Sequence, residues 1–399
     1  MCTGANHNHP AFDFDQVIDR ANTYAIKYDR IKSKGLPQDT LPLWVADMDF
    51  ASPPCIIEAI MERCRHGIIG YSEADEAYGE VLGRWFARRL QWDIQPEWIV
   101  QTPGVVFAIH TAIRALTRPG ESVLIQTPVY YPFAASVKAN ERKLVTNTLA
   151  LVDDHYEIDF ADFEQKIIDN GVKLFIFCSP HNPVGRVWRR DELMRIGDIC
   201  LRHGVVVLSD EIHGDFVFPG HTHHVFAGLN SALNDITITC TAPSKTFNIA
   251  GLQISNILIA NPELRRLFKK ELSCAGYSEA NLIGLISCMA AYEHGEPWLM
   301  ALIAYLAETT DMVRAYLREH IPGIRLIEPE GTYLLWLDCR GLGLHEHDLS
   351  ELMTGKARIW LNNGSMFGYG GEGFWRLNIA SPRSIIAEAL QRLDRALSR

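Results

Sequence analysis

The stretch I-T-I-T-C-T-A-P-S-K-T-F-N, residues 236–248, joins a run of β-branched residues to a short polar segment. The isoleucines and threonines at 236–239 predict a strand, and Pro243 comes after it, a residue that strands exclude from their interior. Lys245 stands just beyond this strand. Most lysines lie on the surface of a protein. Whether Lys245 is a surface residue or part of a site therefore depends on the residues that stand at the ends of the neighbouring strands.

Several other short, continuously apolar runs predict strands of the same sheet. They occupy residues 123–125, 173–178, 205–208 and 254–260. Helical patterns lie between strands, at residues 105–116, 159–169 and 191–203. Apolar strands that alternate with helices are typical of a mostly parallel sheet with helices on both faces. The sequence therefore predicts an α/β fold with a mostly parallel central sheet sandwiched by helices.

The last hundred residues have a different pattern. Residues 297–320 carry apolar side chains at helical spacing, and residues 333–337 and 374–379 resemble strands. We expect a large domain at residues 51–290 and a smaller α+β domain formed by residues 1–50 and 291–399. A chain of 399 residues, 47% of them hydrophobic, is long enough for two cores.

Charge and composition limit the possible partners. A net charge of −10 disfavours nucleic acid and anionic membranes as ligands, and no apolar run approaches the roughly 20 residues of a membrane span. The nine cysteines include no C-x-x-C pair, and residues 1–10 are polar and do not resemble a secretory signal. These features predict a cytoplasmic protein that binds neither nucleic acid nor membrane. The histidine-rich run at 221–224 has no nearby carboxylate or cysteine, so we expect no metal site.

Polar residues come directly after three of the predicted strands. Lys245 follows one, Asn182 follows the strand at 173–178, and Asp210 with Glu211 follows the strand at 205–208. In such sheets ligands bind beyond the carboxyl ends of the strands. An amine, a carboxylate and a carboxamide are the groups that pyridoxal 5′-phosphate requires: a lysine for its aldehyde, a partner for its ring nitrogen and a donor to its ring oxygen. Spacing alone does not choose between Asp210 and Glu211.

Further residues fit the same cofactor less specifically. Gly104, Val105 and Val106 open a predicted helix whose N–H groups could hold a phosphate, although a Pro-Gly pair also simply begins helices. Ser244 could add a hydroxyl. Tyr130 or Tyr131 could stack on the ring. His213 could reach the ring oxygen or be an ordinary core histidine.

At these residues the chain resembles the fold-type I pyridoxal-phosphate enzymes of the class I/II aminotransferase superfamily. More narrowly, it resembles the MalY/PatB group of cystathionine β-lyases and the cystalysin-like cysteine-S-conjugate β-lyases. The resemblance covers nearly the whole chain and rests on several motifs together. These are W-V-A-D-M-D-F at 44–50, G-Y at 70–71, T-P-V-Y-Y-P-F at 127–133, C-S-P-H-N-P-V-G-R-V-W at 178–188, S-D-E-I-H at 209–213, T-A-P-S-K-T-F-N-I-A-G at 241–251 and E-G-T-Y-L at 330–334.

The resemblance implies roles for the matching residues. Lys245 matches the lysine that binds the cofactor covalently, Asp210 the partner of the ring nitrogen, Asn182 the ring-oxygen donor and Tyr130 the stacking tyrosine. Tyr71 matches a catalytic tyrosine that crosses a homodimer interface to the neighbouring subunit's phosphate.

The same resemblance implies the residues of the substrate site. Arg376 and Asn182 would bind the substrate carboxylate, with Ala46 and Tyr131 also in the substrate site. A guanidinium fork suits that task because it matches a carboxylate in two hydrogen bonds.

One departure bears on the reaction. Aminotransferases of this superfamily carry a phosphate-binding arginine eight residues after the lysine, where this chain has Gln253. The lyase group also lacks that arginine. We therefore expect a β-lyase that converts L-cystathionine or another cysteine conjugate to pyruvate, ammonia and a thiol. The alternatives are an aminotransferase on the same scaffold and a regulatory protein with residual lyase activity.

Overall fold

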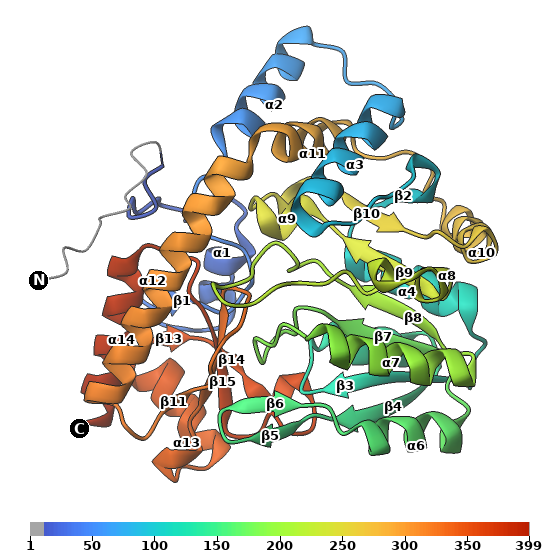
Figure 1. Ribbon diagram of the computed structural model, residues 1–399. Coiled ribbons are helices and arrows are strands. Elements are labelled where there is room, and N and C mark those ends of the chain that lie inside the picture. The colour runs from blue at the N-terminus through green and yellow to red at the C-terminus, as the bar shows by residue number, and fades with distance from the viewer. Residues whose placement is uncertain (1–11, 399) are drawn as a thin grey trace, which may run out of the picture.

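The computed structural model describes residues 12–398 (Figure 1). The segment 1–10, and with it Cys2, lies outside the described residues. Within residues 12–398, no helix has the length and apolar character needed to cross a bilayer.

A seven-stranded sheet forms the centre of the larger part of the molecule, in the order β2-β10-β9-β8-β7-β3-β4. The pairs β3–β4, β3–β7, β7–β8 and β8–β9 are parallel, and β10 runs against both of its neighbours. The predicted, mostly parallel central sheet is confirmed. Its strands are β2 (Ile99–Thr102), β3 (Ser122–Thr127), β4 (Lys143–Thr148), β7 (Leu174–Cys178), β8 (Val206–Asp210), β9 (Thr237–Thr241) and β10 (Ser255–Leu258).

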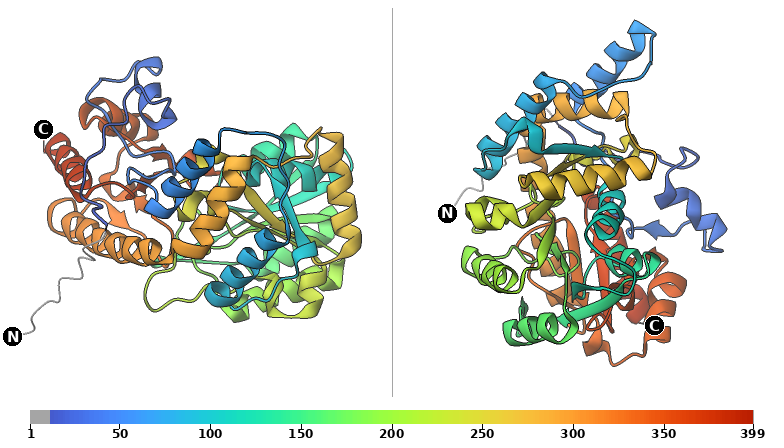
Figure 2. Two further views of the ribbon diagram at one scale, coloured as in Figure 1. Left: turned by 90° about the horizontal axis from the view of Figure 1, so that it is seen from above. Right: turned by 90° about the vertical axis from the view of Figure 1, so that its right-hand side faces the viewer.

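Helices cover both faces of this sheet, as predicted (Figure 2). One apolar core packs α4 (Val105–Leu116), α5 (Pro132–Ala139) and α10 (Pro262–Cys274) against the strands. A second core does the same on the other face with α6 (Phe160–Asn170), α7 (Arg190–His203) and α8 (Ser231–Asp235). Because both faces are buried, the central strands are apolar on both sides, which explains their continuous hydrophobic runs.

Local capping sets the ends of the helices. Asp159 was predicted inside its helix, but it is the N-cap of α6, since its side chain accepts a hydrogen bond from Asp162 N at 3.0 Å. Gly171, at φ +55°, ends that helix in the left-handed conformation that glycine adopts readily.

The smaller part contains a four-stranded antiparallel sheet in the order β11-β12-β15-β14. Its strands are β11 (Arg325–Leu326), β12 (Leu334–Asp338), β14 (Asn362–Asn363) and β15 (Phe374–Asn378). The long helix α12 (Glu296–His320) runs from the larger part down the side of the smaller one, next to α14 (Arg383–Leu397) (Figure 1). The N-terminal segment joins this part because β1 (Leu41–Pro42) pairs with β13 (Ile359–Trp360).

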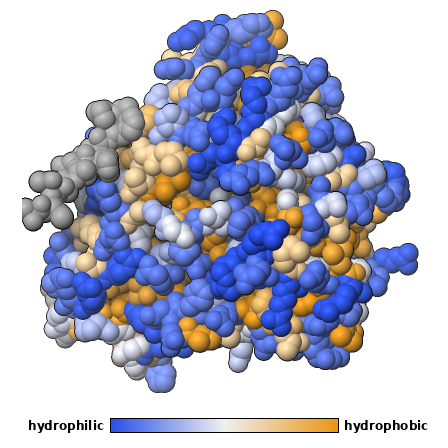
Figure 3. Space-filling view, viewed as in Figure 1, coloured by the Kyte–Doolittle hydropathy of each residue, from blue (hydrophilic) through white to orange (hydrophobic). Residues whose placement is uncertain are grey.

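Six further α-helices and a two-stranded ribbon complete the described part of the chain. The helices are α1 (Ile26–Ser33), α2 (Pro54–His66), α3 (Glu76–Leu90), α9 (Pro243–Thr246), α11 (Leu282–His294) and α13 (Glu346–Ser350), and β5 (Ala150–Val152) pairs with β6 (His155–Glu157). On the face shown in Figure 3, hydrophilic and hydrophobic residues are interspersed, and a few hydrophobic residues lie at the upper tip, near the end of α2 in Figure 1. Ile68, Ile69 and Tyr71, all strongly exposed, come after α2.

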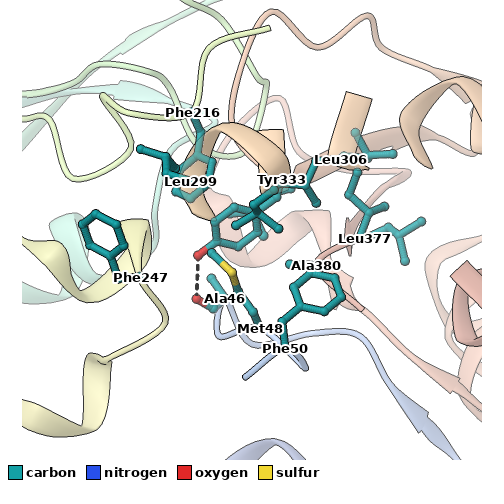
Figure 4. Close-up of a cluster of buried hydrophobic side chains, with 14 of the residues drawn as sticks. Ala46, Met48, Phe50, Phe216, Phe247, Leu299, Leu306, Tyr333, Leu377 and Ala380 are labelled. Carbon is teal, nitrogen blue, oxygen red and sulfur yellow. Dashed lines mark hydrogen bonds between the residues drawn. The ribbon is translucent and has the colours of Figure 1, made fainter. Parts of the chain in front are cut away.

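A third apolar core joins the two parts. It includes Phe50, Phe247 and Leu299 together with Tyr333, which precedes β12, and Leu377 on β15 (Figure 4). The proposed division into domains at residues 51–290 and 1–50 with 291–399 stays a prediction, because this core is continuous across it.

Candidate active site

A cavity of about 270 Å³ lies beyond the carboxyl ends of the central strands, where the two parts meet. β10 presents its first residues there because it runs in the opposite direction. Other hollows on the molecule are larger and more open, but this one gathers the residues predicted from the motifs. Those on its wall are Ala46, Gly104, Val105, Val106, Tyr130, Tyr131, Asn182, Asp210, His213, Ser244, Lys245 and Arg376.

Tyr71 is the predicted site residue that the cavity does not contain. It lies in the connection between α2 and α3, and 97% of its surface is exposed. A tyrosine so exposed serves no site within its own subunit, so its predicted role depends on a second copy of the chain.

Lys245 enters the cavity from α9. Its Nζ donates a hydrogen bond to the carbonyl oxygen of Ala46 at 2.7 Å. Burial lowers the pKa of Lys245 to about 8, although the carboxylates of Asp47 and Asp210 oppose this shift. A substantial fraction of this amine is therefore neutral near physiological pH, as a nucleophile or a base requires.

The structure distinguishes Asp210 from Glu211. Asp210 lines the cavity, and burial raises its pKa to about 7, with a smaller contribution from neighbouring Glu211. Glu211 points elsewhere, where it accepts hydrogen bonds from Ser209 Oγ at 2.7 Å and Phe226 N at 3.1 Å and pairs with His223 Nε2 at 2.9 Å. Glu211 is thus fully engaged in holding the protein together, and Asp210 is the carboxylate available to a ligand.

Arg376, on β15, is buried in the wall of the cavity. Its guanidinium donates to Asn182 Oδ1 at 2.9 Å, Asn362 Oδ1 at 2.6 Å and the carbonyl oxygen of Trp44 at 2.8 Å. All three acceptors are uncharged, and no carboxylate of the described residues forms an ion pair with Arg376. Burial lowers its pKa to about 10, so it stays a cation at neutral pH. A buried, unneutralised guanidinium is suited to binding an anion.

The segment 44–50 forms one side of the cavity and is fixed by two asparagines that the sequence did not single out. Asn248 donates to the carbonyl oxygens of Met48 and Phe50 and accepts from Met48 N. Asn378 donates to the carbonyl oxygens of Val45 and Asp47 at 2.7 and 2.8 Å. Tyr333 also donates to the carbonyl oxygen of Ala46, at 3.0 Å (Figure 4). The Ala46 carbonyl therefore accepts from both Lys245 and Tyr333.

The far end of the cavity has the features of a phosphate site. The first N–H groups of α4, from Val105 and Val106, have no partner within the helix, and the N-terminus of a helix favours negative charge. A Cβ added at Gly104 would meet no atom within 4 Å, which leaves room for a ligand against the backbone. Ser244 and Ser255 add hydroxyl groups to this wall, beside Gln253.

His213 and Tyr130 flank the middle of the cavity. Burial lowers the pKa of His213 to about 3, so its imidazole is neutral, and its Nδ1 is buried without a hydrogen-bond partner. Burial raises the pKa of Tyr130 to about 12, which keeps its phenol protonated. The Tyr130 and Tyr131 rings lie 5.5 Å apart, and both line the cavity.

These residues fit pyridoxal phosphate. Asp210 is a buried carboxylate without an ion-pair partner in the described part of the chain, as expected for a residue that pairs with a ring nitrogen. The unpartnered His213 Nδ1, the Asn182 NH₂ and the open helix end supply polar groups for the ring oxygen and phosphate. Lys245 supplies the amine for the aldehyde.

The histidine-rich run does not form a metal site. His223 is buried against Glu211, and across residues 12–398 no group of three or more histidine, cysteine or acidic side chains could hold a metal ion.

Comparisons with known proteins agree with this geometry. The family Aminotransferase class I and II matches residues 38–393. The chain belongs to this family. Cystathionine β-lyase PatB of Bacillus subtilis is 42% identical over 386 residues, which cover 97% of this chain and all of the relative. Protein MalY of Escherichia coli is 33% identical, with 97% and 99% covered.

Solved structures show the same relationship. The structure of cystalysin from Treponema denticola, which contains a pyridoxal 5′-phosphate cofactor, superimposes with a TM-score of 0.95 at 41% identity and covers 97% of this chain and 99% of the other. The resemblance to the MalY/PatB and cystalysin group is therefore confirmed, and the fold is that of fold-type I pyridoxal-phosphate enzymes.

Proposed function

We propose that this protein is a pyridoxal-phosphate-dependent carbon–sulfur β-lyase that acts on L-cystathionine or another cysteine conjugate. The observation that carries the proposal is the placement of Lys245, Asp210 and Arg376 around one cavity. The relative named cystathionine β-lyase PatB supports this activity, and the cystalysin structure, which contains pyridoxal 5′-phosphate, supports the cofactor.

Arg376, Lys245 and Asp210 have separate roles in the proposed reaction. Arg376, with no carboxylate of its own among the described residues, binds the substrate carboxylate in the fork beside Asn182. Lys245, whose pKa of about 8 leaves much of it neutral, removes the proton from the substrate Cα. The cofactor, when bound, supplies an electron-withdrawing ring that accepts the electron pair of the broken Cα–H bond. Asp210 holds the ring nitrogen in its protonated form.

Elimination then completes the reaction. The Cβ–S bond breaks, the sulfur leaves with the electron pair as a thiolate, and a proton converts it to a thiol. The three-carbon enamine that remains takes up water and yields pyruvate and ammonia. The overall change is one cysteine conjugate and one water to pyruvate, ammonia and thiol, with no oxidant or keto acid consumed.

We also propose that the enzyme is a cytoplasmic homodimer with its sites at the subunit interface. Tyr71 supports the dimer, because it is exposed and does not line its own subunit's cavity. It would contact the neighbouring subunit's phosphate, where Gln253 stands in place of an arginine. None of the described cysteines is in a disulfide, which agrees with a reducing compartment.

The deciding experiment is incubation of the purified holoenzyme with L-cystathionine in the absence of any keto acid. We expect pyruvate and thiol in equal amounts, and their loss in Lys245→Ala. Amine exchange that requires a keto acid, without pyruvate release, would identify an aminotransferase instead.

A further inference from the structure

The turn that carries Lys245 is too short to position itself. α9 has only four residues, Pro243–Thr246, and its closing backbone bond joins Phe247 N to the Pro243 carbonyl oxygen at 2.9 Å. An isolated turn of this length is unstable in water. The position of Lys245 therefore depends on contacts between α9 and the rest of the protein.

Thr246, the residue after Lys245, makes one such contact. Its side chain is almost completely buried, and Oγ1 donates a hydrogen bond to Asp215 Oδ2 at 2.8 Å. Asp215 lies two residues after His213 and five after Asp210. The bond thus connects the segment that carries Lys245 to the segment that carries the groups for the ring nitrogen and ring oxygen.

No other hydrogen bond of the described residues makes this connection. Glu211 N donates to the Cys240 carbonyl oxygen at 2.9 Å where strands β8 and β9 end. Beyond that point, within residues 12–398, the Thr246–Asp215 bond is the one hydrogen bond between the segments 211–219 and 242–252. Without it, the two halves of the cofactor site would be hydrogen-bonded to each other only through the sheet.

The side chain of Asp215 is largely enclosed by other residues, with 10% of it exposed. Burial raises its pKa, and Arg89 Nε, 3.8 Å from Oδ1, opposes this shift. Asp215 is not on the wall of the cofactor cavity; it lines a separate hollow of about 520 Å³ together with Arg89 and His223. It therefore touches neither substrate nor cofactor, and its effect on Lys245 passes through Thr246.

We propose that Asp215 is a positioning residue for Lys245. By accepting the Thr246 hydroxyl, it fixes the lysine-bearing turn relative to Asp210 and His213, so that the amine meets both the cofactor and the substrate Cα. The kinetic part of this proposal rests on the lyase function proposed above. Because Arg376, and not Lys245, binds the substrate carboxylate, the contribution of Asp215 falls on kcat rather than on KM.

The test compares holoenzymes with Thr246→Val, Thr246→Ser, Asp215→Ala and the double change Asp215→Ala/Thr246→Val. Valine keeps the shape of threonine without the hydroxyl, and serine keeps the hydroxyl. Three quantities are measured: kcat and KM for L-cystathionine, the pH dependence of the absorbance of the bound cofactor, and the thermal midpoint.

We expect Thr246→Val and Asp215→Ala each to lower kcat about 10-fold or more, because small displacements of a reacting group are costly, with KM changed by less than about 2-fold. Both should shift the pH at which the cofactor absorbance changes. The double variant should be no worse than either single one, as for two partners of a single bond. Thr246→Ser should restore kcat to within about 3-fold of the parent.

Equal activity of Thr246→Val and Thr246→Ser would overturn the proposal, and so would additive losses in the double variant. If Asp215→Ala fails to fold, the valine–serine pair still decides. If the parent enzyme releases no pyruvate, the lyase function fails. The positioning role is then tested by the cofactor absorbance alone. A shift of its pH dependence in Thr246→Val that is absent in Thr246→Ser supports the role, and equal behaviour of the two variants overturns it.

Discussion

The side-chain nitrogen of Lys245 lies 2.7 Å from the carbonyl oxygen of Ala46, a residue 199 positions earlier in the chain. The bond joins the turn that carries Lys245 to the segment 44–50, and both residues line the cavity. Bonding to the cofactor aldehyde requires Lys245 to leave this carbonyl, which then keeps its bond from Tyr333. The Ala46 carbonyl oxygen therefore accepts a hydrogen bond from the Lys245 amine when the lysine is not bonded to the cofactor.

The first prediction concerns the pH dependence of cofactor uptake. Only the neutral amine attacks an aldehyde, and burial lowers the pKa of Lys245 to about 8. Covalent uptake by the apoprotein should therefore accelerate as pH rises through about 8 and then level off, as followed by stopped-flow absorbance. An acceleration that continues well above that pH would contradict it. In Asp47→Asn the inflection should move to lower pH, because Asp47 stabilises the ammonium form.

The second prediction concerns the carboxylate clamp. Asn362→Asp would place a carboxylate beside the Arg376 guanidinium, where the neutral Asn362 oxygen now lies at 2.6 Å. Because the cation would then be neutralised within the protein, KM for L-cystathionine should rise about 10- to 100-fold with Arg376 intact. Steady-state kinetics checks this, with Arg376→Lys as a comparison that keeps the charge but loses the fork. An unchanged KM in Asn362→Asp would show that Arg376 is not the substrate's partner.

The third prediction separates two neighbouring carboxylates. Asp210→Asn should retain a folded protein but lower kcat on the order of 1,000-fold, since the ring nitrogen would lose its charged partner. Glu211→Gln should leave kcat within about 5-fold but lower the thermal midpoint, because it weakens the buried pair with His223. Kinetics and thermal melts of both variants give the comparison, and the reverse pattern would exchange their roles.

The fourth prediction concerns Asn248, which has φ +57° and makes three side-chain hydrogen bonds to the segment 44–50. Asn248→Ala should reduce the free energy of unfolding by about 2–4 kcal/mol, because buried polar groups lose their partners and alanine is strained at this φ. Asn248→Gly is the matched control. It loses the same hydrogen bonds, but glycine adopts a positive φ without strain. Denaturation should rank parent, glycine and alanine in falling stability. Equal stability of all three would show that the segment does not depend on Asn248.

The fifth prediction tests the shared site. Tyr71→Phe and Lys245→Ala should each have low activity as homodimers. If Tyr71 serves the neighbouring subunit, a mixed dimer contains one site with both native residues. Mixing the two variants under conditions that exchange subunits should then restore activity, up to about a quarter of the parent's if exchange is random. If each variant carries a different affinity tag, two successive affinity purifications isolate the mixed dimer. An inactive mixed dimer would reject the shared site.

The sequence predicted most of the cavity because parallel strands bring their carboxyl ends to one edge. Asp210 is the last residue of β8, and Asn182 and Lys245 follow its neighbours β7 and β9 in the sheet. Their convergence therefore required only the strands to be recognised. Arg376 came from the family resemblance alone, since nothing near it in sequence reveals that it faces a cavity.

The sequence could not predict which adjacent residue faces the ligand or which ordinary residues hold the frame. Asp210 and Glu211 are neighbours with the same chemistry, and only the three-dimensional contacts of Glu211 show which of them is engaged elsewhere. Asn362 stands in the turn-like run N-N-G at 362–364, and Asn248 and Asn378 have no distinctive sequence pattern around them. Asn248 and Asn378 bind backbone groups about 200 and 330 residues away, and such distant contacts leave no local pattern.

The clamp at Arg376 lies on β15, the last strand of the described chain, and bonds to Trp44 at the start of the segment 44–50. A chain that stopped before β15 (Phe374–Asn378) would still contain Lys245, Asp210 and the helix end at Gly104. It would lack both the guanidinium and Asn378, which secures the other wall. The parts that handle the reactive aldehyde thus come earlier in the chain than the part that selects what reaches it. Loss of β15 would also remove Leu377 from the apolar core that joins the two parts, so the C-terminal sequence is needed for folding as well as for substrate binding.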